Sequence, residues 1–164
     1  MSRQGPGRRR PTKFIADAML GSLARKLRAL GFDTTYHDEG GDAGIMKSAS
    51  AQRRIILTAD RDLAGRARSA GIKSYLLTGR TDGRRLAALV LLAKASGHPL
   101  TRGTSRCSVC DGRLARLSRE KVGGSVPPSV QHRHRLFYRC TKCGRYYWRG
   151  GHWKKLRWLE RVLG

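Results

Sequence analysis

Four cysteines form two pairs of identical spacing, Cys107-Ser-Val-Cys110 and Cys140-Thr-Lys-Cys143. Two thiolates separated by two residues reach the same ion from one turn of the chain, and two such turns complete a tetrahedral shell of four sulfurs around zinc. Because four sulfurs close that shell, the pattern predicts a structural zinc ion that folds this segment and takes no part in catalysis. A disulfide framework and a redox Cys-x-x-Cys motif are the alternatives.

A second set of candidate ligands consists of aspartates placed after predicted strands: Asp17, Asp42 and Asp60. The carboxyl ends of parallel strands share one edge of a sheet, so these side chains are expected to converge there. Their mutual repulsion would suit one or two Mg²⁺ or Mn²⁺ ions, which can activate water for phosphodiester hydrolysis. Asp62 could add a ligand. Alternatively, Asp42, Asp60 and Asp62 serve only as helix caps or favourable first-turn charges.

The charge of the chain indicates a polyanionic partner. The 164 residues include 35 Lys and Arg against 11 Asp and Glu, a formal net charge of +24, which favours binding to nucleic acid. Aromatic and basic residues alternate near the C-terminus, a composition that can stack on bases and hold phosphates. The predicted nucleic-acid contacts are Arg135, Arg139, Arg145, Arg149, Lys154, Lys155 and Arg157. His132 and His134 are expected in an exposed loop or at this interface, or as substitute metal ligands.

Two patterns of hydrophobic residues divide the chain. Residues 1–12 are predicted to be a flexible basic arm, and residues 13–99 alternate short apolar runs with helical periodicity. This alternation predicts an α/β domain with a parallel sheet and helices on both faces. We expect strands at 13–16, 33–36, 55–58 and 72–77, and helices at 19–30, 42–54, 60–70 and 82–96. Arg25, Lys26 and Arg28 are expected on the polar face of the first helix.

Residues 100–164 have a different pattern and are predicted to be a zinc ribbon followed by a basic C-terminal helix. Short β-like runs occupy residues 113–117, 136–139 and 145–148, with a long loop containing Pro127 and Pro128 between the first two. No apolar stretch approaches the roughly 18 residues of a membrane span, and no apolar segment follows the first basic residues. The sequence therefore predicts a cytoplasmic protein without a membrane partner.

Several segments together resemble the Mut-seven C-terminal RNase family, in which a short PIN-like domain precedes a zinc ribbon. The similarity runs from Lys13 to about Leu159, and the ending C-x2-C-G-x-x-Y-W-x-G-x-H-W is its most distinctive part. The segments that carry it are FIADAMLGSLARKLRALGFDT, IILTADRDLAGRA, CSVCDGRL, VPPSV and FYRCTKCGRYYWRGGHW.

The resemblance implies roles for particular residues. The first-strand acid of the family corresponds to Asp17, the four zinc ligands to the four cysteines, and the motif T-x-D-R-[DE]-L to Thr58, Asp60, Arg61, Asp62 and Leu63. The family usually has an acidic helix start of the form S-D-E-E-L, whereas this chain has Gly41-Asp42-Ala43-Gly44-Ile45. Asp42 is retained and the acids after it are not; Asp38 and Glu39 are nearby substitutes.

The combined interpretation is a metal-dependent ribonuclease. Asp17, Asp60 and Asp42 would hold Mg²⁺ or Mn²⁺ ions, Asp62 would assist them, and Arg61 would contact a phosphate or orient a carboxylate. Its expected partner is RNA, such as tRNA or rRNA. Many PIN-like nucleases act as toxins, so the resemblance also allows a protein inhibitor or antitoxin. The rival hypothesis is a non-catalytic RNA- or ribosome-binding zinc-ribbon protein whose acids only cap helices.

Overall fold

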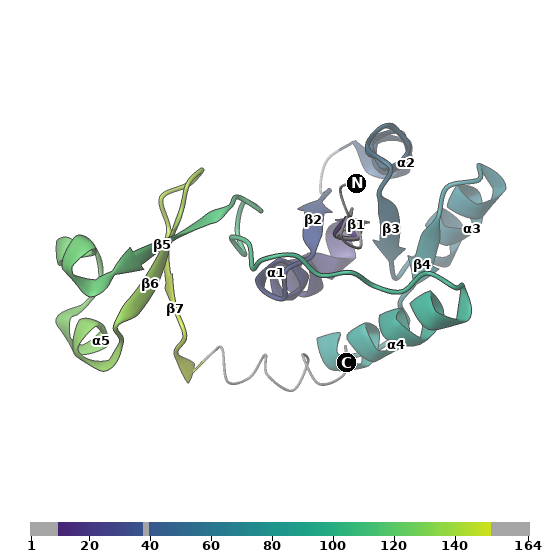
Figure 1. Cartoon of the computed structure of the whole chain (residues 1–164). Helices are drawn as coiled ribbons and strands as arrows, with labels where there is room; N and C mark the ends of the chain where they lie inside the picture. Colours follow the sequence, from purple (N-terminus) through teal and green to yellow (C-terminus); the bar gives the residue numbers. More distant parts are fainter. Residues whose placement is uncertain (1–9, 38–39, 152–164) are drawn as a thin grey trace, which may run out of the picture.

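The structure is a computed structural model that describes residues 10–37 and 40–151. Most of the predicted basic arm and nearly all of the predicted C-terminal helix lie outside these residues, as do Asp38 and Glu39. Two sheets stand apart in the described chain, joined by a long connection that passes the first helix (Figure 1). Within these residues, no helix has the length and apolar character needed to cross a bilayer.

The larger sheet confirms the predicted fold class. Its four strands are all parallel and lie in the order β2-β1-β3-β4. The strands are β1 (Lys13–Ala16), β2 (Asp33–Tyr36), β3 (Ile55–Thr58) and β4 (Ser74–Leu76). The helices are a 3-10 turn (Ala18–Leu20), α1 (Gly21–Ala29), α2 (Gly41–Gln52), α3 (Arg61–Ser69) and α4 (Asp82–Ala95).

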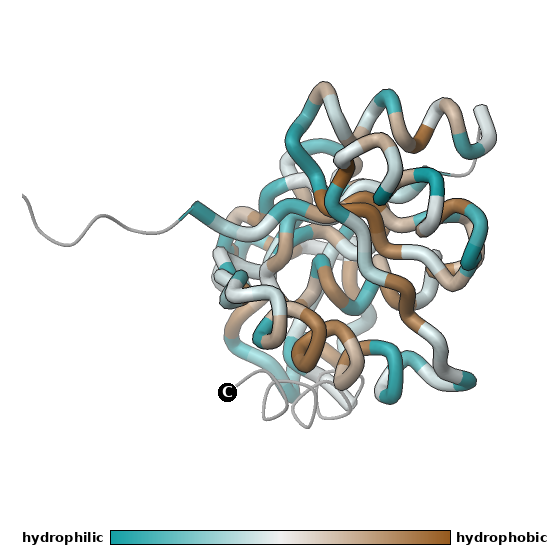
Figure 2. The backbone as a smooth tube through the Cα atoms, turned by 90° about the vertical axis from the view of Figure 1, so that its right-hand side faces the viewer, coloured by the Kyte–Doolittle hydropathy of each residue, from teal (hydrophilic) through white to brown (hydrophobic). Residues whose placement is uncertain are grey.

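Both faces of this sheet are covered, as alternating side chains of a buried parallel strand require. Phe14 and Leu57 pack with α1 and α4 on one face, whereas Ile15 and Ile56 pack with α2 and α3 on the other. In Figure 2 the hydrophobic stretches gather toward the middle of the molecule, and the hydrophilic ones occupy many of its outer turns. The α/β domain thus has a core on each side of the sheet, which holds the strand ends in place.

The smaller sheet is the predicted ribbon, with antiparallel strands in the order β5-β6-β7. These strands are β5 (Leu114–Ser118), β6 (Leu136–Cys140) and β7 (Tyr146–Trp148). The segment between β5 and β6, expected to be a loop, contains two 3-10 turns (Arg119–Lys121 and Gly123–Ser125) and a short helix, α5 (Pro128–Arg133). The buried core of the ribbon is small and consists of Val122, Val126 and Phe137.

The connection between the two sheets is bonded to the α/β domain. Thr12 N donates to Thr101 O at 2.9 Å, and Gly103 N donates to Gly31 O at 2.8 Å. Gly31 adopts a φ of 95°, and a Cβ at this position would lie 2.4 Å from Gly103 O. Only glycine therefore permits the close approach at Gly31, and the ribbon is held beside α1.

Candidate active site and metal centre

The four cysteines come together as the spacing predicts. All are free, and their sulfur atoms lie within 4.8 Å of one another. Tetrahedral zinc with Zn–S bonds of about 2.3 Å separates its sulfurs by about 3.8 Å. The distances of 3.6 Å between Cys107 Sγ and Cys143 Sγ and 3.4 Å between Cys110 Sγ and Cys140 Sγ are close to that value. The donor set therefore fits zinc, and the disulfide alternative is wrong for this structure.

The surroundings of two of the sulfurs, those of Cys107 and Cys140, lower the thiol pKa and favour thiolates. The Cys110 backbone N–H points at Cys107 Sγ (3.5 Å), and the Lys142 and Cys143 backbone N–H groups point at Cys140 Sγ (3.4 Å each). Burial alone raises the pKa of Cys107, but the Tyr147 hydroxyl at 2.9 Å and backbone N–H groups lower that pKa to about 6. Hydrogen bonds of this kind orient metal ligands and tune their basicity.

Gly112 leaves room for the cluster. A Cβ on this residue would lie 2.7 Å from Cys140 Sγ, closer than real Cβ atoms approach, and 3.0 Å from Lys142 Cβ, which is tighter than most real contacts. The first cysteine turn therefore needs glycine here for steric reasons. His132 and His134, the substitute ligands, are not part of the cluster: His132 lies in α5, and the His134 ring contacts Phe137 edge-on at 6.4 Å between centroids.

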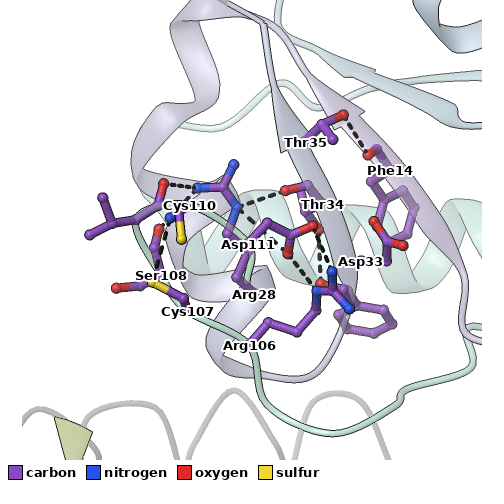
Figure 3. A network of polar contacts seen from close by, with 12 residues as sticks. Phe14, Arg28, Asp33, Thr34, Thr35, Arg106, Cys107, Ser108, Cys110 and Asp111 are labelled. Carbon is purple, nitrogen blue, oxygen red and sulfur yellow. Dashed lines mark hydrogen bonds and ion pairs between the residues drawn. The ribbon is translucent and has the colours of Figure 1, made fainter. Parts of the chain in front are cut away.

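A buried arginine joins the cysteine turn to the α/β domain, contrary to the prediction that Arg28 lies on a polar helix face (Figure 3). Arg28 Nε donates to Thr34 O at 2.7 Å, and Arg28 Nη1 donates to Ser108 O at 3.0 Å and Val109 O at 2.8 Å. Ser108 and Val109 are the two residues between the first pair of cysteines. The guanidinium is buried because it satisfies carbonyls from both domains at once.

An acid completes this network. Arg106 binds both oxygens of Asp111, at 2.7 and 3.2 Å, and Arg28 Nε lies 3.9 Å from Asp111 Oδ1. Burial raises the pKa of Asp111 despite these cations, and the negative charge of Asp33 adds to that rise. The sequence interpretation assigned no role to Arg106 or Asp111, and the partners of Arg28 in the cysteine turn lie 80 and 81 residues away in sequence.

Replacing Arg28 with methionine should destabilise the folded chain by about 3–5 kcal/mol, because the substitution leaves three carbonyls without their donor and removes a cation beside the Asp111 carboxylate. Arg25→Met, three residues earlier on the same helix but exposed, is the matched control and should change stability by less than about 0.5 kcal/mol. Denaturant unfolding monitored by circular dichroism measures both. Equal stability of the two variants would show that the network is dispensable.

Two of the predicted catalytic aspartates are linked through one threonine. Asp17 follows β1 and is 8% exposed, and its carboxylate accepts hydrogen bonds from Met19 N (2.9 Å), Ala59 N (3.3 Å) and the Thr58 hydroxyl. The same hydroxyl accepts a hydrogen bond from Asp60 N at 2.9 Å. The ends of adjacent parallel strands thus hold Asp17 and Asp60 at one edge of the sheet, as expected.

The other predicted residues of this edge occupy different surroundings. Asp42 lies in the first turn of α2, and its carboxylate pairs with Arg66 of α3. Asp62 and Arg61 are exposed at the start of α3, where Asp60 Oδ1 caps the helix by accepting from Asp62 N (2.7 Å) and Leu63 N (3.3 Å). Among the described residues, only the cysteines form a group of three or more ligands within 4.8 Å of one another. Asp17, Asp42 and Asp60 are therefore not that close together.

The same edge contains a histidine that the sequence interpretation did not select. His37 follows β2, and its backbone N–H donates to Ala16 O at 2.9 Å. Its Nε2 is buried and has no hydrogen-bond partner within the part of the chain that the structure describes. The sequence signal that could have identified His37 is its position directly after the strand predicted at 33–36.

The predicted nucleic-acid contacts are only partly described, because Lys154, Lys155 and Arg157 lie outside the described residues. Arg135, Arg139, Arg145 and Arg149 are all exposed on the ribbon. The guanidinium of Arg139 stacks on the Tyr146 ring at 5.6 Å. The ribbon therefore presents several guanidinium groups to solvent.

Comparison with known proteins identifies the family of the chain. No curated protein and no solved structure matches the chain. The family model described as Mut7-C RNAse domain matches residues 12–159, which include both sheets and all four cysteines. The chain therefore belongs to the Mut7-C RNAse domain family.

Proposed function

We propose that this protein is a metal-dependent ribonuclease that hydrolyses RNA phosphodiester bonds at the edge of the parallel sheet, with the zinc ribbon binding RNA. The observation that carries the proposal is the link from Asp17 through the Thr58 hydroxyl to Asp60. It holds two carboxylates at the carboxyl ends of neighbouring strands, where ligands of open α/β sheets bind. Membership of a ribonuclease family supports the same activity.

The donor set suits Mg²⁺ or Mn²⁺, because magnesium in proteins is typically held by one or two carboxylates and substrate phosphates. Within the described residues both hydrogen bonds to the Asp60 side chain fall on Oδ1, which leaves Oδ2 for a ligand. A bound divalent cation would supply Lewis-acid activation of water and neutralise charge at the phosphate. Thr58 orients the Asp17 carboxylate, and the exposed Arg61 would bind a phosphate of the substrate.

The pairing of Asp42 with Arg66 changes the role that we propose for Asp42. Its carboxylate is engaged by a cation from α3, so in this arrangement Asp42 links two helices. Asp17 and Asp60 therefore carry the proposal, and the acidic helix start common in the family is not required for it. Asp62 would assist from the first turn of α3.

One observation favours the rival function, a non-catalytic RNA-binding protein. Asp60 caps α3, and Asp17 caps the 3-10 turn by accepting from Met19 N at 2.9 Å. Capping alone is a sufficient structural reason for an aspartate at these positions. The two functions differ in their effect on RNA: the nuclease cleaves it and needs a divalent cation to do so, whereas the binding protein leaves it intact.

Cleavage of end-labelled RNA by the purified protein should require added Mn²⁺ or Mg²⁺. Because water is the proposed nucleophile, the products should carry no 2′,3′-cyclic phosphate, which attack by the neighbouring ribose hydroxyl would leave. Gel electrophoresis and mass spectrometry of the fragments measure both properties. Cyclic phosphate ends, or cleavage unaffected by the cation, would contradict the mechanism; tight binding without cleavage would favour the rival function.

A further inference from the structure

A cleft lies between helix α1 of the α/β domain and the ribbon sheet. Its volume is about 1090 Å³, near the upper end of the roughly 300–1,000 Å³ of ligand pockets in proteins. Its lining includes four aromatic residues of the ribbon, Tyr138 and Tyr147 among them, and the cations Arg25, Lys26, Arg106 and Arg149. The acidic edge of the sheet does not contribute Asp17 or Asp60 to this lining.

The strand register explains why aromatic rings are available on the ribbon wall. Tyr138 of β6 pairs with Tyr147 of β7, so both side chains lie on the same face of the sheet. Phe137 pairs with Trp148, and Phe137 is buried on the opposite face with Val122. Trp148 packs against that cluster and also reaches the lining of the cleft. The hydroxyl of Tyr147 contacts Cys107 Sγ at 2.9 Å, which anchors this ring at the zinc site.

The opposite wall supplies positive charge. Arg25 is exposed on α1, whereas Arg106, in the connection that leads into the ribbon, is already bonded to Asp111. The acid that lines the cleft, Asp82, is neutralised by Lys26 and by Arg85, whose Nη1 lies 3.6 Å from Asp82 Oδ1. An aromatic face opposite a cationic helix is complementary to a base and its phosphate.

We propose that this cleft binds single-stranded RNA, with an unpaired base stacked on Tyr138 and the phosphate backbone beside Arg25. Bases within a duplex are already stacked on their neighbours, whereas unpaired bases can be stacked on aromatic side chains. Ser22 and Asp82 line the cleft where α1 and α4 begin, and Ser22 is five residues after Asp17. A strand leaving the cleft at that end would reach the acidic edge. This inference rests on the proposed function for its choice of RNA.

Binding should be measured on full-length Asp17→Asn protein without added Mg²⁺ or Mn²⁺, so that the RNA stays intact. Fluorescence anisotropy would compare a labelled single-stranded oligonucleotide with a duplex of the same sequence, and the single strand should bind at least about tenfold more tightly. Tyr138→Ala in this background should weaken single-strand binding about 5- to 150-fold, as the loss of one base–aromatic stack predicts. Tyr138→Phe keeps the ring and should bind within about twofold of the parent.

A charge substitution tests the other wall independently of folding of the ribbon. Arg25→Gln should reduce the slope of log affinity against log salt by about 1, whereas Arg68→Gln, exposed on α3, should leave the slope unchanged. Zinc content confirms that each ribbon variant is folded. Equal affinity for single strand and duplex, or unchanged binding by both Tyr138→Ala and Arg25→Gln, would overturn the cleft proposal. Cleavage by the wild type would still test the nuclease separately.

Discussion

Substituting asparagine for Asp17 should lower the rate of metal-dependent RNA cleavage by at least about 100-fold. A cation held by Asp17 would stabilise the transition state by several kcal/mol, and each 1.36 kcal/mol lost is a factor of ten in rate. Asparagine has the same shape as aspartate and retains an oxygen for the Met19 N–H, so the fold should survive while the negative charge is removed. Single-turnover cleavage with Mn²⁺ titrated over a wide range measures the effect.

Glu120→Gln is the matched control for this charge change. Glu120 is exposed in a 3-10 turn of the ribbon, so its neutralisation should leave the cleavage rate unchanged. If the Asp17→Asn protein cleaves RNA at the wild-type rate, the activity comes from a contaminant or Asp17 only caps the turn that follows it. A loss of activity accompanied by loss of RNA binding would point to misfolding.

Replacing Cys140 with serine should unfold the ribbon while the α/β domain remains folded. Structural zinc contributes about 10–16 kcal/mol in small zinc-folded peptides, and this ribbon has only a small buried core to replace it. Cys140 Sγ is buried and also accepts the backbone N–H groups of Lys142 and Cys143. Hydrogen exchange followed by mass spectrometry should show loss of protection in β5, β6 and β7 and continued protection in β1 and β3.

Metal analysis provides the control for that experiment. The wild type should contain one zinc per chain, and His132→Ala should contain the same amount, because the cluster is made of cysteines alone. Zinc retained at full stoichiometry by Cys140→Ser, with the ribbon still protected from exchange, would refute the structural role of this ligand. A histidine ligand would instead be revealed by zinc loss in His132→Ala.

Local patterns predicted most of the fold. Strands β1, β2 and β3 begin and end at the expected residues. Short apolar runs set the limits of β1 and β3, and the strand-favouring residues Thr and Tyr mark β2. The spacing of the cysteines predicted their cluster because two Cys-x2-Cys turns are a common ligand set for one tetrahedral zinc ion. Helix α5 was missed because its six residues contain no apolar periodicity, although Pro128 begins it as proline commonly does.

Contacts between distant residues could not be predicted in this way. Arg28 was assigned to a polar face by helical periodicity, yet it is buried because carbonyls 80 and 81 residues later dock against it. The position of Asp42 at a helix start was correct, but its pairing with Arg66 depends on how α2 and α3 pack together. Periodicity reports which face of an element is apolar and carries no information about the partner that will satisfy a buried polar group.

The connection that is bonded to the α/β domain has a consequence for the speed and strength of recognition. Hydrogen bonds at Thr101, Gly103 and Arg106 restrain this segment before any ligand arrives. A flexible tether would lose conformational entropy when both domains gripped one strand, and that loss would subtract from the binding free energy. In this chain the connection already holds α1 and the ribbon together as the two walls of the cleft. Association with RNA should therefore proceed as docking to a rigid receptor.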